Sequence, residues 1–191
     1  MAPIWETVAQ DFASEPTVLI AKVDAEAENS KATARDQDVK SYPTIKFFPK
    51  GSTAPEPYDG GRTEEALVEF MNGKAGTFRA PGGTLGPKAG VIESMNAVVQ
   101  KYIGGESIDS ISQEAKKASN GLTAKYAQYY IKVFEKLGSS QQYAEKELAR
   151  LEGLMKKGGL APEKLDDLTS RANILRSFSA KDEAKEDKSE L

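Results

Sequence analysis

Residues 76–90, GTFRAPGGTLGPKAG, are dense in glycine and proline, and the hydrophobic pattern of the chain changes across them. Before them, apolar runs rich in β-branched residues alternate with stretches of helical periodicity. After them, residues 91–178 show helical periodicity alone. Because glycine and proline interrupt regular structure, this stretch is the best candidate for a domain boundary. We therefore expect an α/β part followed by an all-α part.

The first part contains one run that resembles a buried strand. TVLIAKVDA, residues 17–25, is almost continuously apolar and β-branched, which predicts a strand covered on both faces in a parallel sheet. Thr63 is the expected cap of the last helix in this part, and Gly73 its expected end. Asn29 is a plausible cap of a weaker helix. In chain order we expect a helix over 4–13, a strand over 17–25, a weak helix over 29–39, a strand over 44–49, a short antiparallel strand near 56–58 and a helix after Thr63.

The second part carries five apolar helical stripes separated by short breaks, which is typical of a compact antiparallel bundle. Ser107 is the expected cap of the second helix, and Pro162 suits the first position of the fifth. The third stripe includes Leu122 and a group of aromatic residues. We interpret these aromatic side chains as core, with an exposed client-binding patch as the alternative. They are Tyr126, Tyr129, Tyr130 and Phe134.

The absence of cysteine and histidine excludes most familiar catalytic centres. Without cysteine, the chain has no disulfide, no thiol nucleophile and no CxxC redox centre. Zinc sites built from cysteine or histidine, and triads with an imidazole base, are excluded as well. The net charge is −3, which offers no positive field for nucleic acid, and no apolar run is long enough to span a bilayer. We expect no cofactor, no metal, no nucleic-acid partner and no membrane insertion.

The acidic cluster of Glu163, Asp166 and Asp167 is interpreted as the solvated face of a helix rather than a metal or glycosidase site. The last residues, AKDEAKEDKSEL, form a charged tail. The start of the chain, MAPIWETVAQDF, has neither the basic nor the apolar region of a signal peptide.

One proline stands where a strand is expected to begin. Tyr42-Pro43 comes directly before the apolar run TIKFF, although proline cannot donate a hydrogen bond to a strand ladder. The order strand, helix, strand with a leading proline, hairpin strand and helix resembles half of a thioredoxin fold. In thioredoxin-like proteins this position carries a cis-proline. A turn proline before an edge strand is the alternative interpretation of Pro43.

The first part also resembles a catalytic domain of the protein disulfide-isomerase family. The resemblance covers residues 1–75 and rests on APIWETVA, VLIAKVDA, SYPTIKFFPKG and YDGGRTEEALVEFMNG, in that order. In that family the stretch matching residues 2–6 follows the CGHCK active site, so the chain is expected to begin just downstream of the redox motif. The fold expected is a partial thioredoxin-like fold. Two strands that flank residues 17–25 in the complete fold would be missing, so residues 1–75 alone are expected to fold poorly.

The second part is similar to the all-helical C-terminal domain found in one branch of these endoplasmic-reticulum proteins. The domains expected are residues 1–75, a linker over 76–89, a five-helix bundle over 90–178 and a tail over 179–191. The bundle is expected to fold independently. The final KSEL resembles the KDEL retrieval signal, with serine at its second position. Its residues are Lys188, Ser189, Glu190 and Leu191.

The resemblance implies several functional expectations. Tyr42, Pro43 and Thr44 would contact the backbone of a substrate peptide. Arg62 matches an arginine that tunes the pKa of an active-site cysteine in the family; with no cysteine present, a solvated loop cation is the alternative. Family members exchange disulfides in unfolded secretory proteins in the endoplasmic-reticulum lumen, and a retrieval receptor would bind KSEL.

We therefore predict a protein disulfide-isomerase family member that is itself inactive in thiol–disulfide exchange. One alternative is a redox-inactive chaperone or escort that binds unfolded clients through the helical domain. Another is a cytosolic adaptor, which would follow if no signal peptide had ever been present.

Overall fold

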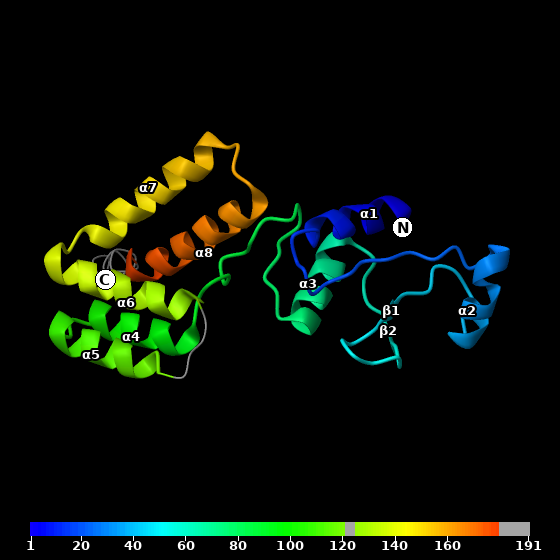
Figure 1. The fold of residues 1–191 in the computed structure, drawn as a ribbon, viewed down its shortest axis with the longest axis horizontal. Coiled ribbons are helices and arrows are strands. Elements are labelled where there is room, and N and C mark those ends of the chain that lie inside the picture. Colours follow the sequence, from blue (N-terminus) through cyan, green and yellow to red (C-terminus); the bar gives the residue numbers. More distant parts are fainter. Residues whose placement is uncertain (121–124, 180–191) are drawn as a thin grey trace, which may run out of the picture. The chain divides into compact units, whose positions relative to one another are not determined.

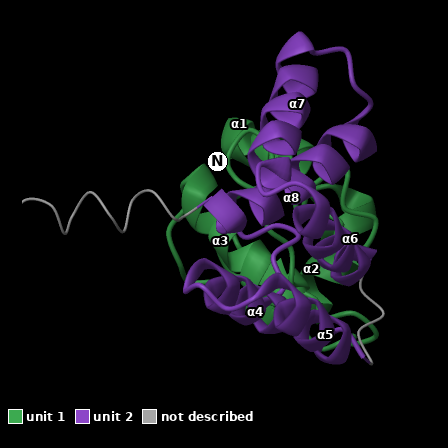
Figure 2. Ribbon diagram, turned by 90° about the vertical axis from the view of Figure 1, so that its left-hand side faces the viewer, with its two compact units in different colours: residues 1–86 green, residues 87–191 purple. Residues whose placement is uncertain are grey.

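A computed structural model describes residues 1–120 and 125–179 of the protein. By its internal contacts the chain falls into two compact units, residues 1–86 and residues 87–191, which are coloured separately in Figure 2. Within the described residues the regular structure is mostly helical, with a single two-stranded sheet (Figure 1). None of these helices combines the length and the apolar character needed to cross a membrane.

The first unit contains three α-helices and the sheet. Its elements are α1 (Ala2–Asp11), a 3-10 turn (Glu28–Ser30), α2 (Lys31–Asp36), β1 (Lys46–Phe47), β2 (Glu56–Pro57) and α3 (Glu64–Ala75). The two strands are antiparallel, as expected, with Lys46 opposite Pro57. The expected cap of α3 is confirmed, because the Thr63 hydroxyl accepts a hydrogen bond from the Ala66 N–H group at 3.3 Å. The helix-breaking role expected of Gly73 is wrong: α3 continues to Ala75, and Gly76 ends it in the left-handed conformation.

The core of the first unit lies between α1 and α3. Val8 of α1 and Phe12, the residue that follows α1, pack against Leu67 and Val68 of α3, and all four are buried. The spacing of Val8 and Phe12 on one helical stripe is the reason that α1 presents both to the same neighbour. Figure 1 shows the two helices side by side. Partly buried residues from the extended segments complete this core, among them Val18, Ile20, Ile45 and Tyr58.

The expected strand over residues 17–25 does not form. The segment runs as an extended trace from the end of α1 toward α2 (Figure 1), but it belongs to no strand. A β-branched sequence favours an extended backbone, but a strand also needs a neighbouring strand for its N–H and C=O groups, and none of the described residues forms one beside this segment. The helix expected over 29–39 is also shorter than predicted, and Asn29 does not cap it.

The second unit is a bundle of five helices within the described residues. They are α4 (Glu93–Ile103), α5 (Ile108–Ala118), α6 (Lys125–Ser139), α7 (Tyr143–Lys157) and α8 (Pro162–Ser179). The expected fold class, a partial thioredoxin-like fold followed by a small helical bundle, is confirmed. Ser107 caps α5 through the N–H group of Ser110, and α8 begins at Pro162, both as predicted. Leu122 lies outside the described residues.

The aromatic stripe of α6 forms the centre of the bundle core. Tyr130 and Phe134 are fully buried, and Tyr129 is nearly so. The ring of Phe134 packs edge-on against Phe178 of α8, with centroids 5.0 Å apart. Tyr126 is partly buried against the same cluster. The core interpretation is therefore confirmed, and the alternative of an exposed client-binding patch is wrong for these residues.

One acidic residue of α8 is not on the solvated face predicted for it. Asp167 is buried, and its carboxylate forms ion pairs with Lys125 at 2.5 Å and with Arg171 at 3.0 Å. Burial alone raises the pKa of Asp167, but the two cations outweigh burial and hold the pKa below its usual value. Sequence periodicity cannot reveal this pairing, because Lys125 comes from a different helix.

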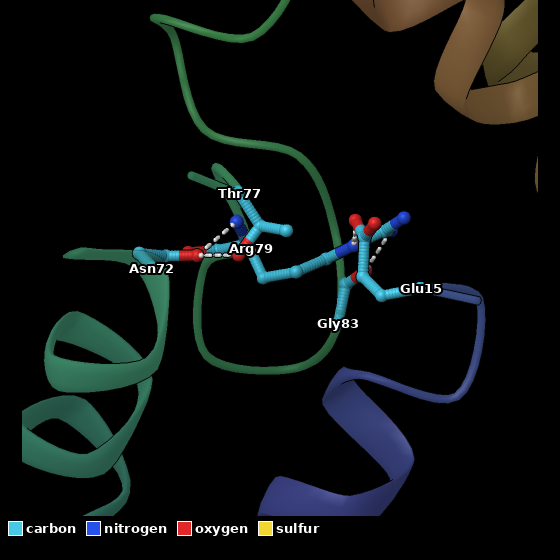
Figure 3. A network of polar contacts seen from close by, with 5 residues as sticks. All are labelled: Glu15, Asn72, Thr77, Arg79 and Gly83. Carbon is cyan, nitrogen blue, oxygen red and sulfur yellow. Dashed lines mark hydrogen bonds and ion pairs between the residues drawn. The ribbon is translucent and has the colours of Figure 1, made fainter. Parts of the chain in front are cut away.

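The stretch that follows α3 is tied back to the first unit by a polar network (Figure 3). The buried guanidinium of Arg79 forms an ion pair with Glu15 at 2.7 Å and donates to the carbonyl oxygen of Gly83 at 2.9 Å. Asn72 of α3 accepts hydrogen bonds from the Arg79 N–H group and from the Thr77 hydroxyl, both at 2.9 Å. These contacts keep residues 77–83 against the helices of the same unit.

Candidate functional site

The first unit contains a groove of about 560 Å³. One wall is the unpaired segment over residues 21–26, and the other runs from Tyr42 to Phe48. Trp5 of α1 and residues of α2 close the groove further. Three large apolar side chains of the walls are exposed to solvent, namely Val23, Tyr42 and Phe48. A hollow lined by exposed apolar residues is a surface suited to binding another molecule.

The residues predicted to contact substrate all line this groove. The Tyr42-Pro43 peptide bond is cis, and Tyr42 is exposed. Thr44 donates a hydrogen bond from its hydroxyl to the carbonyl oxygen of Ser41 at 2.6 Å, which fixes the turn beside the proline. The structure therefore brings Tyr42, Pro43 and Thr44 together on one wall. Their role in binding a peptide stays a prediction.

Arg62 lies behind this wall. Its guanidinium donates a hydrogen bond to the carbonyl oxygen of Pro43 at 3.4 Å, a long contact. Arg62 does not itself line the groove. With no cysteine in the chain, there is no thiol whose pKa this cation could lower.

α1 anchors the opposite wall. The indole N–H group of Trp5 donates to the carbonyl oxygen of Ala21 at 3.1 Å. Glu6 pairs with Lys22 at 2.9 Å, and this hydrogen bond and positive charge lower the pKa of the Glu6 carboxyl. The two contacts hold residues 21 and 22 against α1 without using a strand ladder.

Sequence reasoning missed the apolar residues of the groove walls. Val23 was assigned to a strand covered on both faces, and Phe48 to another strand. The structure leaves 64% of Val23 and 49% of Phe48 exposed. The alternation of Leu19, Ala21 and Val23 along the segment is the signal that could have identified an outward apolar face.

The groove is lined by apolar side chains and has no thiol. The chain contains neither cysteine nor histidine, so no thiol or imidazole group of its own can act there. Among the described residues, no cluster of carboxylates could hold a metal ion. The four residues of the KSEL sequence lie outside the described residues.

Comparisons with known proteins cover both units. The family model of the C-terminal domain of endoplasmic reticulum protein ERp29 matches residues 90–178, and the thioredoxin model matches residues 1–73. The chain is 56% identical to protein disulfide-isomerase tigA of Aspergillus niger over 191 residues, which is 100% of the chain and 52% of that relative. It is 53% identical to protein disulfide-isomerase erp38 of Neurospora crassa over 193 residues, 98% of the chain and 52% of the relative.

A plant protein gives the same pattern at lower identity. The probable protein disulfide-isomerase A6 of Medicago sativa is 38% identical over 186 residues, 94% of the chain and 50% of the relative. The chain spans about half the length of the curated relatives it matches. A thioredoxin match is followed by an ERp29-type helical match, and the relatives align with nearly the whole chain. The chain therefore belongs to the protein disulfide-isomerase family.

Proposed function

We propose that this chain binds unfolded secretory polypeptides in the lumen of the endoplasmic reticulum without exchanging their disulfides itself. The observation that carries the proposal is the groove beside Tyr42 and Pro43, with exposed Val23 and Phe48 in its walls. Unfolded polypeptides expose apolar side chains and unpaired backbone, and both can be accommodated in such a groove.

The absence of cysteine supports the second half of this proposal. Thiol–disulfide exchange requires a thiolate that attacks one sulfur of a disulfide and displaces the other sulfur as a thiolate. This chain has no sulfur nucleophile of that kind, since its only sulfur atoms belong to methionine. We assign the exchange reaction to the longer proteins of the family, whose names include the activity, and polypeptide binding to this chain.

The family match to an endoplasmic reticulum protein supports the proposed location. Retrieval would use the last four residues, with the Leu191 carboxylate recognised by a receptor in the secretory pathway. Attaching residues 180–191 to a secreted reporter tests this step. Intracellular retention supports it, and secretion equal to that of a reporter without Leu191 contradicts it.

Two assays test the proposed function on the whole chain. Insulin reduction in a dithiothreitol buffer should proceed at the rate of the buffer alone. Light scattering of a thermally unfolding client should fall when the chain is present at equimolar concentration. Unchanged scattering would contradict the first half of the proposal, polypeptide binding. Acceleration of insulin reduction by mass-verified protein would contradict the second half, the lack of disulfide exchange.

A matched pair of variants locates the binding surface. Phe48 and Phe78 are both exposed in the first unit, at 49% and 43%, but only Phe48 lines the groove. Phe48→Asp should therefore abolish most of the suppression of client aggregation, whereas Phe78→Asp should leave it intact. Equal loss in both variants would indicate nonspecific apolar binding.

A second candidate is an escort that binds clients through the helical unit. It is favoured by a hollow of about 550 Å³ in that unit, whose lining residues include Ile108, Phe178, Gln142 and Glu145. The same variants separate the two candidates. If the helical unit holds the client, Phe48→Asp will suppress aggregation as well as the unaltered chain does.

A further inference from the structure

Among the described residues, one wall of the groove is a strand edge without a neighbouring strand. β1 pairs with β2 on one side only, where the Tyr58 N–H group donates to the carbonyl oxygen of Ile45 at 3.0 Å. In an antiparallel pair, residues whose backbone groups face the partner alternate with residues whose groups face away. Ile45 and Phe47 therefore face β2, and the N–H and C=O groups of Lys46 face the other side. Pro57, opposite Lys46, has no N–H group, in agreement with this register. Lys46 lines the groove.

The other wall carries unpaired backbone groups as well. Among the described residues, the N–H groups of residues 19–23 have no hydrogen-bond partner, and the only bond to this stretch of backbone is the one from Trp5 to the Ala21 carbonyl. The side chains alternate as in a strand: Val18 and Ile20 pack on the core, while Leu19 is 86% exposed. The segment thus has the side-chain pattern of a strand and lacks the strand's neighbour.

The size of the groove suits a single strand. Neighbouring strands lie about 4.8 Å apart, rise about 3.3 Å per residue and belong to layers about 10 Å thick, so each inserted residue fills about 160 Å³. The groove of about 560 Å³ therefore holds three to four residues of one strand.

We propose that the groove takes up one extended segment of a client polypeptide, which inserts as a strand between residues 21–23 and β1. This inference rests on the polypeptide binding proposed above and specifies its mode. The client backbone pairs with Lys46 on one side and with the unpaired segment on the other. The apolar walls, which include Val23 and Phe48, favour β-branched apolar residues in the inserted segment, because a strand paired on both edges is shielded from water.

A capped heptapeptide of alternating valine and threonine is a direct probe. Trp5 is the single tryptophan of the chain and bonds to the groove wall, so its fluorescence reports on occupancy. The matched control is the same peptide with N-methyl groups on alternate residues, which removes N–H donors and keeps the side chains. We expect saturable binding of the first peptide and at least tenfold weaker binding of the second. Equal affinity would overturn strand insertion.

A pair of variants tests the same step from the protein side. Lys46→Pro removes the N–H group that faces the groove and leaves the β2 ladder intact, whereas Lys46→Ala removes only the side chain. The heptapeptide should bind at least tenfold more weakly to Lys46→Pro than to Lys46→Ala, since both variants lose the side chain and only the first loses the N–H group. Equal binding to both would overturn the inference. If far-UV circular dichroism shows that Lys46→Pro is unfolded, the two peptides decide alone.

The outcomes also separate this inference from the proposed function. The chain could suppress client aggregation through Phe48 and yet show no Trp5 response to the heptapeptide. That result overturns strand insertion and leaves polypeptide binding in place. If neither the suppression of aggregation nor the Trp5 response is seen, strand insertion and polypeptide binding are both overturned.

Discussion

Phe134 lies at the centre of the helical unit, with 1% of its surface exposed and its ring 5.0 Å from Phe178 and 6.2 Å from Tyr102. Phe134→Ala removes these contacts and leaves a cavity. Substitutions of this kind in protein cores cost about 3–5 kcal/mol. A domain of this size has a free energy of unfolding of about 5–15 kcal/mol, so the change should remove a large share of the total.

The assay is urea unfolding of residues 87–191 as a separate fragment, followed by far-UV circular dichroism. This fragment contains every residue of the helical core, so we expect cooperative unfolding. With a urea dependence of about 1–3 kcal/mol per molar, Phe134→Ala should lower the midpoint by at least about 1 M. Glu135→Ala is the control on the same helix, where only an exposed ion pair with Lys116 is lost; the expected change is about 0–1 kcal/mol.

Two results would refute this reasoning. A non-cooperative transition of the unaltered fragment would show that the helical unit does not fold by itself. A Phe134→Ala midpoint equal to that of Glu135→Ala, combined with weaker suppression of client aggregation, would show that the aromatic stripe is a binding surface rather than a core.

Two further predictions concern glycine packing and a buried acid. Gly90 and Gly159 both have positive φ angles, but a Cβ atom at Gly90 would lie 2.6 Å from that of Ser170, whereas the space at Gly159 is open. Gly90→Ala should therefore lower the thermal midpoint of the helical unit more than Gly159→Ala, and equal shifts would contradict the packing. Burial, followed by the negative charge of Glu64, raises the pKa of Asp11. The folded state then keeps a proton on Asp11 above the carboxyl's ordinary pKa, so stability falls as the pH rises through that window. Asp11→Asn should slow hydrogen exchange in α1 at pH 7, with less effect near pH 4; faster exchange at pH 7 would contradict this.

The helical unit was predictable from sequence because its pattern is local. The helices follow from apolar spacing, and the start of α8 follows from Pro162. The position of Asp167 was not predictable, because it pairs with Lys125 of α6 as well as with Arg171 four residues along α8, and Lys125 reaches it only in the folded bundle.

The first unit was less predictable because strands depend on distant partners. The apolar run around Ile20 favours an extended backbone whether or not a neighbour exists, so periodicity alone indicated a strand. The proline at position 43 was identified from its place before β1, and it does line the groove. Phe48 was missed as a wall residue, because exposure is a property of the assembled unit.

One dissociation constant shows whether this chain binds polypeptide without thiol chemistry. The client should be permanently unfolded and free of cysteine, so that no disulfide can form with it, and binding to the whole chain should be followed through Trp5. The account predicts a saturable signal that is weakened at least tenfold by Phe48→Asp and unaffected by Phe78→Asp. Absence of saturable binding at client concentrations up to about 1 mM would contradict polypeptide binding by this chain. It would mean a binding free energy weaker than about −4 kcal/mol.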